Sequence, residues 1–164
     1  MTIFLKNKHT LQIDDFYFKC CIGKNGISNK KKEGDKKTPK GTYGIEHLYC
    51  RTDKLKKPIT SLKCVSITKN MGWCDDLSAP KKYNRMIKIK ENIKCEKLYR
   101  HDYKYDLLIP IKYNFKKPVV GRGSCIFIHL TKNYLPTAGC IALQKKDFLI
   151  LLKIINKHSK IKIY

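Results

Sequence analysis

A histidine and a cysteine stand close together in the stretch 121–143, in settings that suit nucleophilic catalysis. His129 ends the run Ser-Cys-Ile-Phe-Ile-His, and Cys140 follows the small residues Thr-Ala-Gly. A cysteine nucleophile needs a thiolate, a base or cation that favours the thiolate, and backbone N–H groups that receive the developing oxyanion. This stretch contains candidates for all three requirements.

The turn before Cys140 is built from small side chains. Because Gly139 has no Cβ, the N–H groups of Gly139 and Cys140 can face a carbonyl oxygen without obstruction. The following Ile-Ala-Leu is expected to re-enter the core and hold the turn rigid. The chain has eight cysteines and five histidines, so one such pair arises easily by chance. A catalytic role for this histidine and cysteine must therefore be supported by the secondary-structure elements and motifs around them.

Hydrophobic patterns predict a mainly β protein in a single domain over residues 1–164. Apolar residues at helical spacing predict one clear helix, at 147–157 near the C-terminus. Residues 86–100 fit a strand followed by a short helix. Alternating or β-branched runs predict strands at 2–5, 16–22, 42–48, 64–68, 105–113, 124–130 and 161–164.

Two long loops are expected, at 23–41 and 70–85. The first is dense in Gly, Pro, Asn and Lys, which fits either a solvated charged loop or the basic rim of a substrate groove. The second carries Trp73, Asp75 and Asp76, and long loops in compact domains tend to be functional. Trp73 fits a packing anchor or a substrate platform, and the two acids fit loop-capping or catalytic roles.

The formal net charge of +23 raises the question of a polyanionic partner. Only four of the 36 basic residues are arginines, whereas base-reading sites favour the bidentate arginine fork. The lysines are scattered along the chain, as biased coding composition would also produce. We therefore expect no nucleic-acid partner, although a polyanionic envelope surface would still be attracted.

The eight cysteines contain no C-x-x-C pair and no Cys/His box with structural-zinc spacing. We expect no metal or other cofactor, and most cysteines reduced. Cys64 and Cys125 lie in strand-like runs, where a free cysteine usually behaves as a small buried hydrophobe. The N-terminal residues lack the apolar core of a secretory signal, and no later run reaches the length of a membrane span. This suggests a cytoplasmic protein, export by another route, or a chain that has lost its leader.

Four segments, in order, resemble the L,D-transpeptidase catalytic-domain (YkuD-like) family. The catalytic signature of that family, a histidine followed by Ser/Thr-x-Gly-Cys, is similar to Gly-Ser-Cys-Ile-Phe-Ile-His129 with Pro-Thr-Ala-Gly-Cys140. Its Thr-Pro-x-Gly-x-(Phe/Tyr) segment is similar to Lys-Thr-Pro-Lys-Gly-Thr-Tyr at 37–43. Two further segments resemble the small bacterial branch of the family, whose members end soon after the catalytic helix. They are Gly-Trp-Cys-Asp-Asp at 72–76 with Tyr-Asn-Arg at 83–85, and Pro-Val-Val-Gly-Arg-Gly-Ser at 118–124.

This resemblance implies a β-sandwich with one or two short helices, and acyl transfer on peptidoglycan stem peptides. Cys140 would be the nucleophile and His129 the general base, paired as thiolate and imidazolium and with His129 oriented by a backbone carbonyl. The Gly139 N–H would bind the oxyanion. The implied protein is a monomer of the cell envelope or periplasm. Residues implied at the substrate are Thr38, Trp73, Tyr83, Arg85, Arg122, Thr137 and Ala138.

The sequence departs from the family pattern at two places beside the cysteine. Many members carry histidine before Gly-Cys and arginine shortly after it, whereas this chain has Ala138 and the run Ile-Ala-Leu-Gln. Arg122 or Arg85 are candidates for binding the substrate carboxylate instead. Two rival functions stay open: an L,D-carboxypeptidase or amidase of the same fold, and a basic polyanion-binding protein whose cysteine centre is inert.

Overall fold

The computed structural model describes residues 1–29, 31–89 and 92–164, and this part of the chain is mainly β with one α-helix near the C-terminus. The helix is α1 (Lys145–Ile154). The strands are β1 (Thr2–Asn7), β2 (Thr10–Ile13), β3 (Phe16–Cys21), β4 (Ile27–Ser28), β5 (Thr38–Pro39), β6 (Gly41–Gly44), β7 (Leu48–Cys50), β8 (Cys64–Ser66), β9 (Met71–Cys74), β10 (Met86–Lys88), β11 (Cys95–Lys97), β12 (Leu107–Pro110), β13 (Phe127–Leu130), β14 (Ile141–Leu143) and β15 (Lys160–Ile163).

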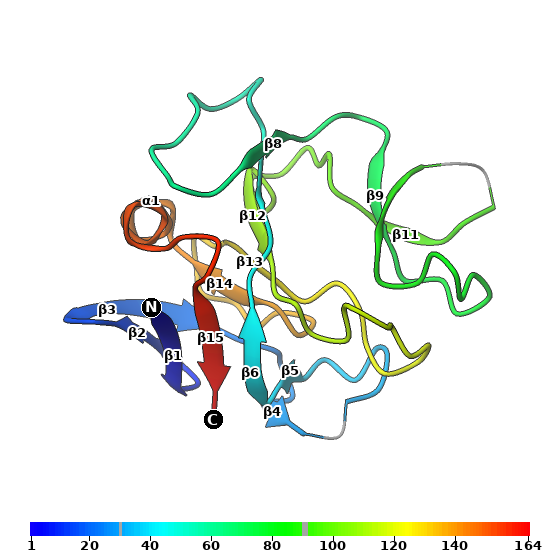
Figure 1. Ribbon diagram of the computed structural model, residues 1–164, viewed down its shortest axis with the longest axis horizontal. Helices are drawn as coiled ribbons and strands as arrows, with labels where there is room; N and C mark the ends of the chain where they lie inside the picture. Colours follow the sequence, from blue (N-terminus) through cyan, green and yellow to red (C-terminus); the bar gives the residue numbers. More distant parts are fainter. Residues whose placement is uncertain (30, 90–91) are drawn as a thin grey trace.

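Among the described residues, ten strands form one curled sheet in the order β6-β15-β1-β2-β3-β14-β13-β12-β7-β8 (Figure 1). The parallel pairing of β1 with β15 brings the two ends of the chain together. Period-two alternation turns Ile3 and Leu5 of β1, and Ile161 and Ile163 of β15, into the larger hydrophobic core. The outward residues of β15 are lysines.

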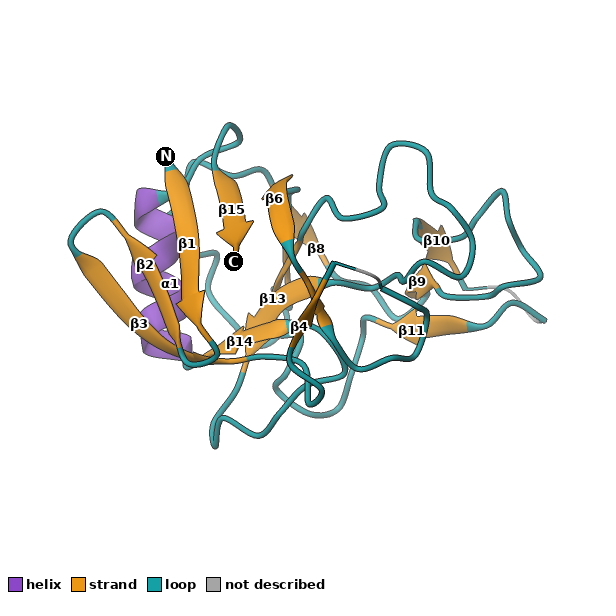
Figure 2. Ribbon diagram, turned by 90° about the horizontal axis from the view of Figure 1, so that it is seen from below, coloured by secondary structure: helices purple, strands orange, loops and turns teal. Residues whose placement is uncertain are grey.

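Helix α1 covers the part of the sheet formed by β1, β2 and β3 (Figure 2). Its apolar stripe buries Phe148, Leu151 and Leu152 in the same core as the strands. Asp147 lies in the first turn and Lys153 in the last, which complements the helix dipole. This core therefore anchors β14, which leads directly into α1.

A second core lies on the side of the molecule away from α1, under the small sheet β10-β9-β11 (Figure 1). Trp73 of β9 occupies its centre, with ring centroids 5.3 Å from Phe127 and 6.3 Å from Tyr49. Cys140 belongs to this second core, whereas the next residue, Ile141, belongs to the first. The catalytic candidates therefore lie where the two cores meet.

Several predicted elements need correction. The expected strand 42–48 breaks between β6 and β7, because Ile45 makes only an isolated bridge to Ile111. The expected loop 70–85 contains β9, and the expected short helix within 86–100 is wrong, because its described part forms β10 and β11. Strand β2 was not expected. Residue 30 of the loop 23–41 and residues 90 and 91 of the segment 86–100 lie outside the described residues.

The prediction that Cys64 is a free thiol is also wrong. Cys64 forms a disulfide with Cys50, and the bond joins the parallel strands β7 and β8 at the end of the large sheet. The predicted free state of Cys125 is confirmed. In the described part of the chain, no helix has the length and apolar character needed to cross a membrane.

Candidate active site

Strand pairing places His129 and Cys140 on the same face of the large sheet. Strands β13 and β14 are parallel neighbours, with His129 opposite Ala142. Alternation turns Phe127 and His129 of β13 toward one face and Ile128 toward the larger core. Cys140 lies two residues before Ala142 and thus emerges on the His129 face. The small side chain of Ala142 leaves room beside the imidazole.

The turn before Cys140 requires glycine because of a close backbone approach. Gly139 has φ +137°, and a Cβ at this position would lie 2.9 Å from the carbonyl oxygen of Lys37. Thr38 supports the same turn through its hydroxyl, which donates to the Gly139 carbonyl at 2.9 Å and accepts from the Gly23 N–H at 3.0 Å. The Thr-Pro segment therefore acts on the turn through fully buried Thr38.

Thr137 closes the turn through its hydroxyl. Its Oγ1 donates to the Cys140 carbonyl at 2.6 Å and accepts from Gly139 N–H at 3.1 Å. Backbone hydrogen bonds to Ile22 and Lys24 fix Thr137 itself. The Gly139 N–H thus has a partner inside the turn, and binding an oxyanion requires sharing or releasing that hydrogen bond.

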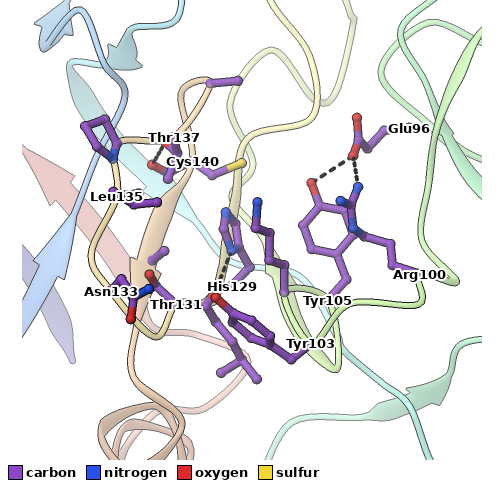
Figure 3. A pocket seen from close by; sticks show the side chains of 15 residues that line it. Glu96, Arg100, Tyr103, Tyr105, His129, Thr131, Asn133, Leu135, Thr137 and Cys140 are labelled. Atoms are coloured by element: carbon purple, nitrogen blue, oxygen red, sulfur yellow. Dashed lines mark hydrogen bonds and ion pairs between the residues drawn. The ribbon is translucent and has the colours of Figure 1, made fainter.

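A backbone carbonyl orients His129, which confirms the prediction made from the motif. Nδ1 of His129 lies 2.9 Å from the Leu130 carbonyl oxygen, the dashed contact in Figure 3. When Nδ1–H donates to this carbonyl, Nε2 keeps its lone pair and is the basic nitrogen. The Tyr105 ring packs edge-on against the imidazole, with centroids 5.4 Å apart. Figure 3 shows the imidazole and the Cys140 sulfur at the same cavity.

The Cys140 sulfur lies between a backbone acceptor and a backbone donor. Its S–H donates to the carbonyl of Cys125 at 3.2 Å, and the sulfur accepts from Phe127 N–H at 3.4 Å. Burial raises the pKa of the Cys140 thiol to about 12, against a lowering by Phe127 N–H. Burial also lowers the pKa of His129 to about 4, a shift that the Leu130 carbonyl opposes.

These two pKa directions favour a neutral thiol beside a neutral imidazole. Burial thus opposes the resting thiolate and imidazolium pair expected from the motif, because it penalises both charged forms. A neutral pair still supports general-base catalysis, in which the proton moves from sulfur to nitrogen as the sulfur attacks.

Two cavities meet at Cys140. The first, of about 260 Å³, is lined by His129 and also by Arg100, Lys104 and Thr137 (Figure 3). The second, of about 450 Å³, is lined mainly by charged residues of the 31–36 loop and of the small-sheet region, including Asp75 and Lys94. Both cavities share Glu96, Tyr105, Ala138 and Cys140. A substrate can therefore approach the sulfur from two sides.

The predicted site residues divide into two groups. His129, Thr137, Ala138 and Cys140 come together at the first cavity, with Gly139 buried behind them. The rest line neither cavity: Thr38, Trp73 and Tyr83 are buried, and Arg85 and Arg122 are exposed elsewhere. Their predicted contact with substrate has no support from the cavity lining. In the described residues, no group of three or more His, Cys, Asp or Glu side chains is arranged to hold a metal.

Sequence reasoning missed five residues of the first cavity that come from one stretch, Glu96 to Tyr105. Glu96 accepts from the Tyr105 hydroxyl at 3.2 Å and pairs with Arg100 at 3.2 Å. Arg100 also pairs with Asp102 at 2.7 Å. For the Lys104 ammonium, the described residues provide no hydrogen bond or ion pair. The spacing of these residues in the sequence does not mark them as part of a site. The stretch from Glu96 to Tyr105 comes close to Cys140 only because β11 and β12 fold it there.

Comparison with known proteins identifies the family. The profile of YkuD, the L,D-transpeptidase catalytic domain, matches residues 1–163, so the chain belongs to this family. The family is associated with the cell envelope, acts on peptidoglycan and is typically enzymatic. For the family as a whole, this domain implies a peptidoglycan-related function of the L,D-transpeptidase type. No curated protein matches the chain.

Solved structures show the same fold at low sequence identity. The helical cell shape determining protein Pgp2 from Campylobacter jejuni aligns over 99% of this chain with 18% identity and a TM-score of 0.50. A mutant of that protein gives a TM-score of 0.51 with 18% identity and 99% coverage. Bd1075 from Bdellovibrio bacteriovorus aligns over 99% of this chain with 15% identity and a TM-score of 0.48. The match spans 46%, 45% and 47% of those chains, so this chain is less than half of their length.

Proposed function

We propose that this protein is a cysteine acyltransferase that forms peptidoglycan cross-links through a Cys140 acyl-enzyme. The observation that carries the proposal is the strand register, which places His129 and Cys140 on one face beside a shared cavity. Family membership supplies the substrate class. Envelope localisation and a single catalytic domain over residues 1–164 belong to the same proposal.

The first half-reaction breaks an amide bond of the stem peptide. Nε2 of His129 takes the thiol proton while the sulfur attacks the carbonyl of an L-centre that is joined to a D-amino acid. Backbone N–H groups of Cys140 and Gly139 stabilise the oxyanion. His129 then gives its proton to the departing nitrogen, so a thioester remains on Cys140 and the D-amino acid leaves as an amine.

In the second half-reaction, an amine of another stem attacks the thioester and His129 accepts its proton. The C–S bond then breaks, and His129 returns the proton to the Cys140 sulfur. Because His129 serves both the leaving and the attacking nitrogen, both must reach the cavity that His129 lines. The acyl chain then occupies the second cavity, where lysines and carboxylates match a peptide that carries both charges. Lys104 lines the first cavity, and its ammonium makes no ion pair with the residues that the structure describes, which supports a role in binding the α-carboxylate beside the nitrogen.

Product analysis with purified disaccharide tetrapeptides tests this proposal. A transpeptidase yields cross-linked dimers, whereas water as the acceptor yields trimmed tripeptides and indicates the carboxypeptidase. Cys140→Ala and His129→Ala should both lose product, because each removes one partner of the proton transfer. Failure of the wild-type enzyme to form either product from any stem peptide would contradict the proposal.

A further inference from the structure

Cys125 holds a strained backbone conformation beside the nucleophile. Its φ is +54°, a region that side chains with a Cβ rarely adopt. Its carbonyl accepts the Cys140 S–H at 3.2 Å. Strained residues persist only where their surroundings hold them, and they cluster at functional sites. Contacts with neighbouring residues must therefore hold the Cys125 backbone in this conformation.

Asn84 makes such contacts. Its Oδ1 accepts from the Cys125 N–H at 3.2 Å and from the Trp73 indole N–H at 2.9 Å. Its Nδ2 donates to the carbonyls of Tyr113 at 3.0 Å and Asn114 at 2.7 Å. The residue is only 4% exposed. Every hydrogen-bonding group of the amide is thus used inside the protein, and the amide ties Cys125 to two other segments.

A second set of contacts restrains the residue before Cys125. Ser124 donates to the Glu33 carboxylate at 2.8 Å, and Tyr83 donates to the same carboxylate oxygen. The Tyr83 hydroxyl also accepts from Gly123 N–H at 3.1 Å. Residues 123–125 are therefore held from two directions. Asn84 holds the Cys125 N–H, and the backbone angles of Cys125 link that N–H to the carbonyl that accepts the Cys140 S–H.

The held carbonyl sets the environment of the sulfur. A carbonyl that accepts the S–H stabilises the thiol, whereas the Phe127 N–H stabilises the thiolate. Release of the Cys125 peptide would remove the first effect and leave the second. The titratable and charged groups that surround the sulfur from other elements are Cys21, Lys31, Glu96, Tyr105 and His129.

We propose that Asn84 is a positioning residue that fixes the Cys125 peptide and thereby sets the place and protonation of the Cys140 sulfur. This inference rests on the proposed role of Cys140 as nucleophile. Asn84 acts through a backbone carbonyl and touches no substrate. This role belongs to the backbone carbonyl of Cys125 and not to its thiol.

The test is peptide-resolved alkylation of Cys140 by iodoacetamide as a function of pH, followed by mass spectrometry. In Asn84→Ala, the alkylation midpoint should fall by roughly half to one pH unit, because one hydrogen bond to the neutral thiol is lost. The rate of acylation by a stem tetrapeptide should fall by about 10- to 100-fold, since the sulfur is displaced. Asn84→Asp, a near-isosteric variant, should shift the midpoint upward, because its negative charge disfavours a thiolate.

Asn114→Ala is the matched control. Asn114 also has a positive φ of +48°, and its amide bonds Val119 and Gly123 without contacting Cys125 or Cys140. Opposite shifts in the two Asn84 variants and no shift in Asn114→Ala support the inference. An unchanged midpoint in both Asn84 variants, or the same fall in Asn114→Ala, would overturn it. Alkylation by iodoacetamide does not require a stem peptide. If the Asn84 variants shift the alkylation midpoint but the wild-type protein is never acylated by a stem peptide, the proposed function is rejected and the positioning role of Asn84 stands.

Discussion

At the scale of single residues, burial favours the neutral form of both proposed catalytic groups, His129 and Cys140. The Leu130 carbonyl selects the tautomer of His129, and the Tyr105 ring shields the imidazole from water. A neutral imidazole is a ready base, whereas a preformed imidazolium would already hold the proton. This arrangement makes His129 a source of pH-dependent stability.

We predict that the free energy of unfolding falls as the pH drops from about 6.5 to about 4. The unfolded histidine binds a proton near its ordinary pKa of 6.5, whereas burial lowers the pKa in the folded protein to about 4. The unfolded state therefore binds more protons in this window, and stability is lost there, by roughly 3 kcal/mol in all. Urea unfolding across this range measures the effect.

His129→Gln should remove most of this pH dependence, because glutamine does not titrate. His9→Gln is the control, since His9 is exposed and should leave the wild-type curve unchanged. The same slope in wild type and His129→Gln would show that other groups cause the acid sensitivity.

We predict that Lys104 binds the carboxylate of the D-amino acid that leaves in the first half-reaction. Lys104→Met should raise KM for a tetrapeptide with a free C-terminus by about 2- to 5-fold, the range of an exposed ion pair. The same variant should leave KM unchanged for a tetrapeptide with a C-terminal amide, which carries no charge. Lys36→Met, at the other cavity, should not distinguish these two peptides. Equal losses on both peptides would argue against a carboxylate contact.

The sequence motif predicted two residues that the fold brings to one cavity, His129 and Cys140, and the backbone carbonyl that orients the histidine. It did not reveal Lys104 or Asn84, because both reach the site through contacts between distant segments. Arg85 and Arg122 look suitable as carboxylate ligands by residue type alone. The fold leaves both outside the two cavities at Cys140, so the cavity lining gives their predicted contact with substrate no support.

At the scale of elements, strands β13 and β14 and the turn between them position the two proposed catalytic residues, His129 and Cys140. Alternation made β15 predictable from sequence, and short apolar runs separated by polar turn residues did the same for β1 and β3. Strand β9 was hidden, because all four of its residues are buried and it lacks a polar face. The 86–100 segment misled for another reason: its mixed lysine pattern fits helix and strand equally, and pairing with β9 decided the outcome.

The turn before Cys140 gives a prediction at this scale. Gly139→Ala should destabilise the protein by about 1–3 kcal/mol and lower the acylation rate, because a Cβ would press on the Lys37 carbonyl. Gly121→Ala is the matched control: Gly121 also has positive φ, +81°, but no atom lies within 4 Å of its added Cβ. Equal urea midpoints for the two variants would contradict the proposed contact.

At the scale of the whole molecule, the charge of +23 does not produce an arginine-rich binding face. Within the described residues, Arg51 and Arg100 already pair with Asp53 and Asp102, each at 2.7 Å. The guanidinium groups best suited to reading nucleic-acid bases are thus partly used inside the protein. A role in attraction to an anionic envelope surface remains compatible with the lysine-rich exterior.

In the proposed function, Cys140 is the single residue of the molecule to which the acyl group of the stem peptide becomes attached. The most direct measurement is the intact mass of the protein after mixing with a stem tetrapeptide, with the adduct mapped by peptide digestion. We predict an added acyl group on Cys140 in the wild type and in Cys125→Ala, and none in Cys140→Ala. An adduct that persists in Cys140→Ala, or that maps to another cysteine in the wild type, would contradict the account.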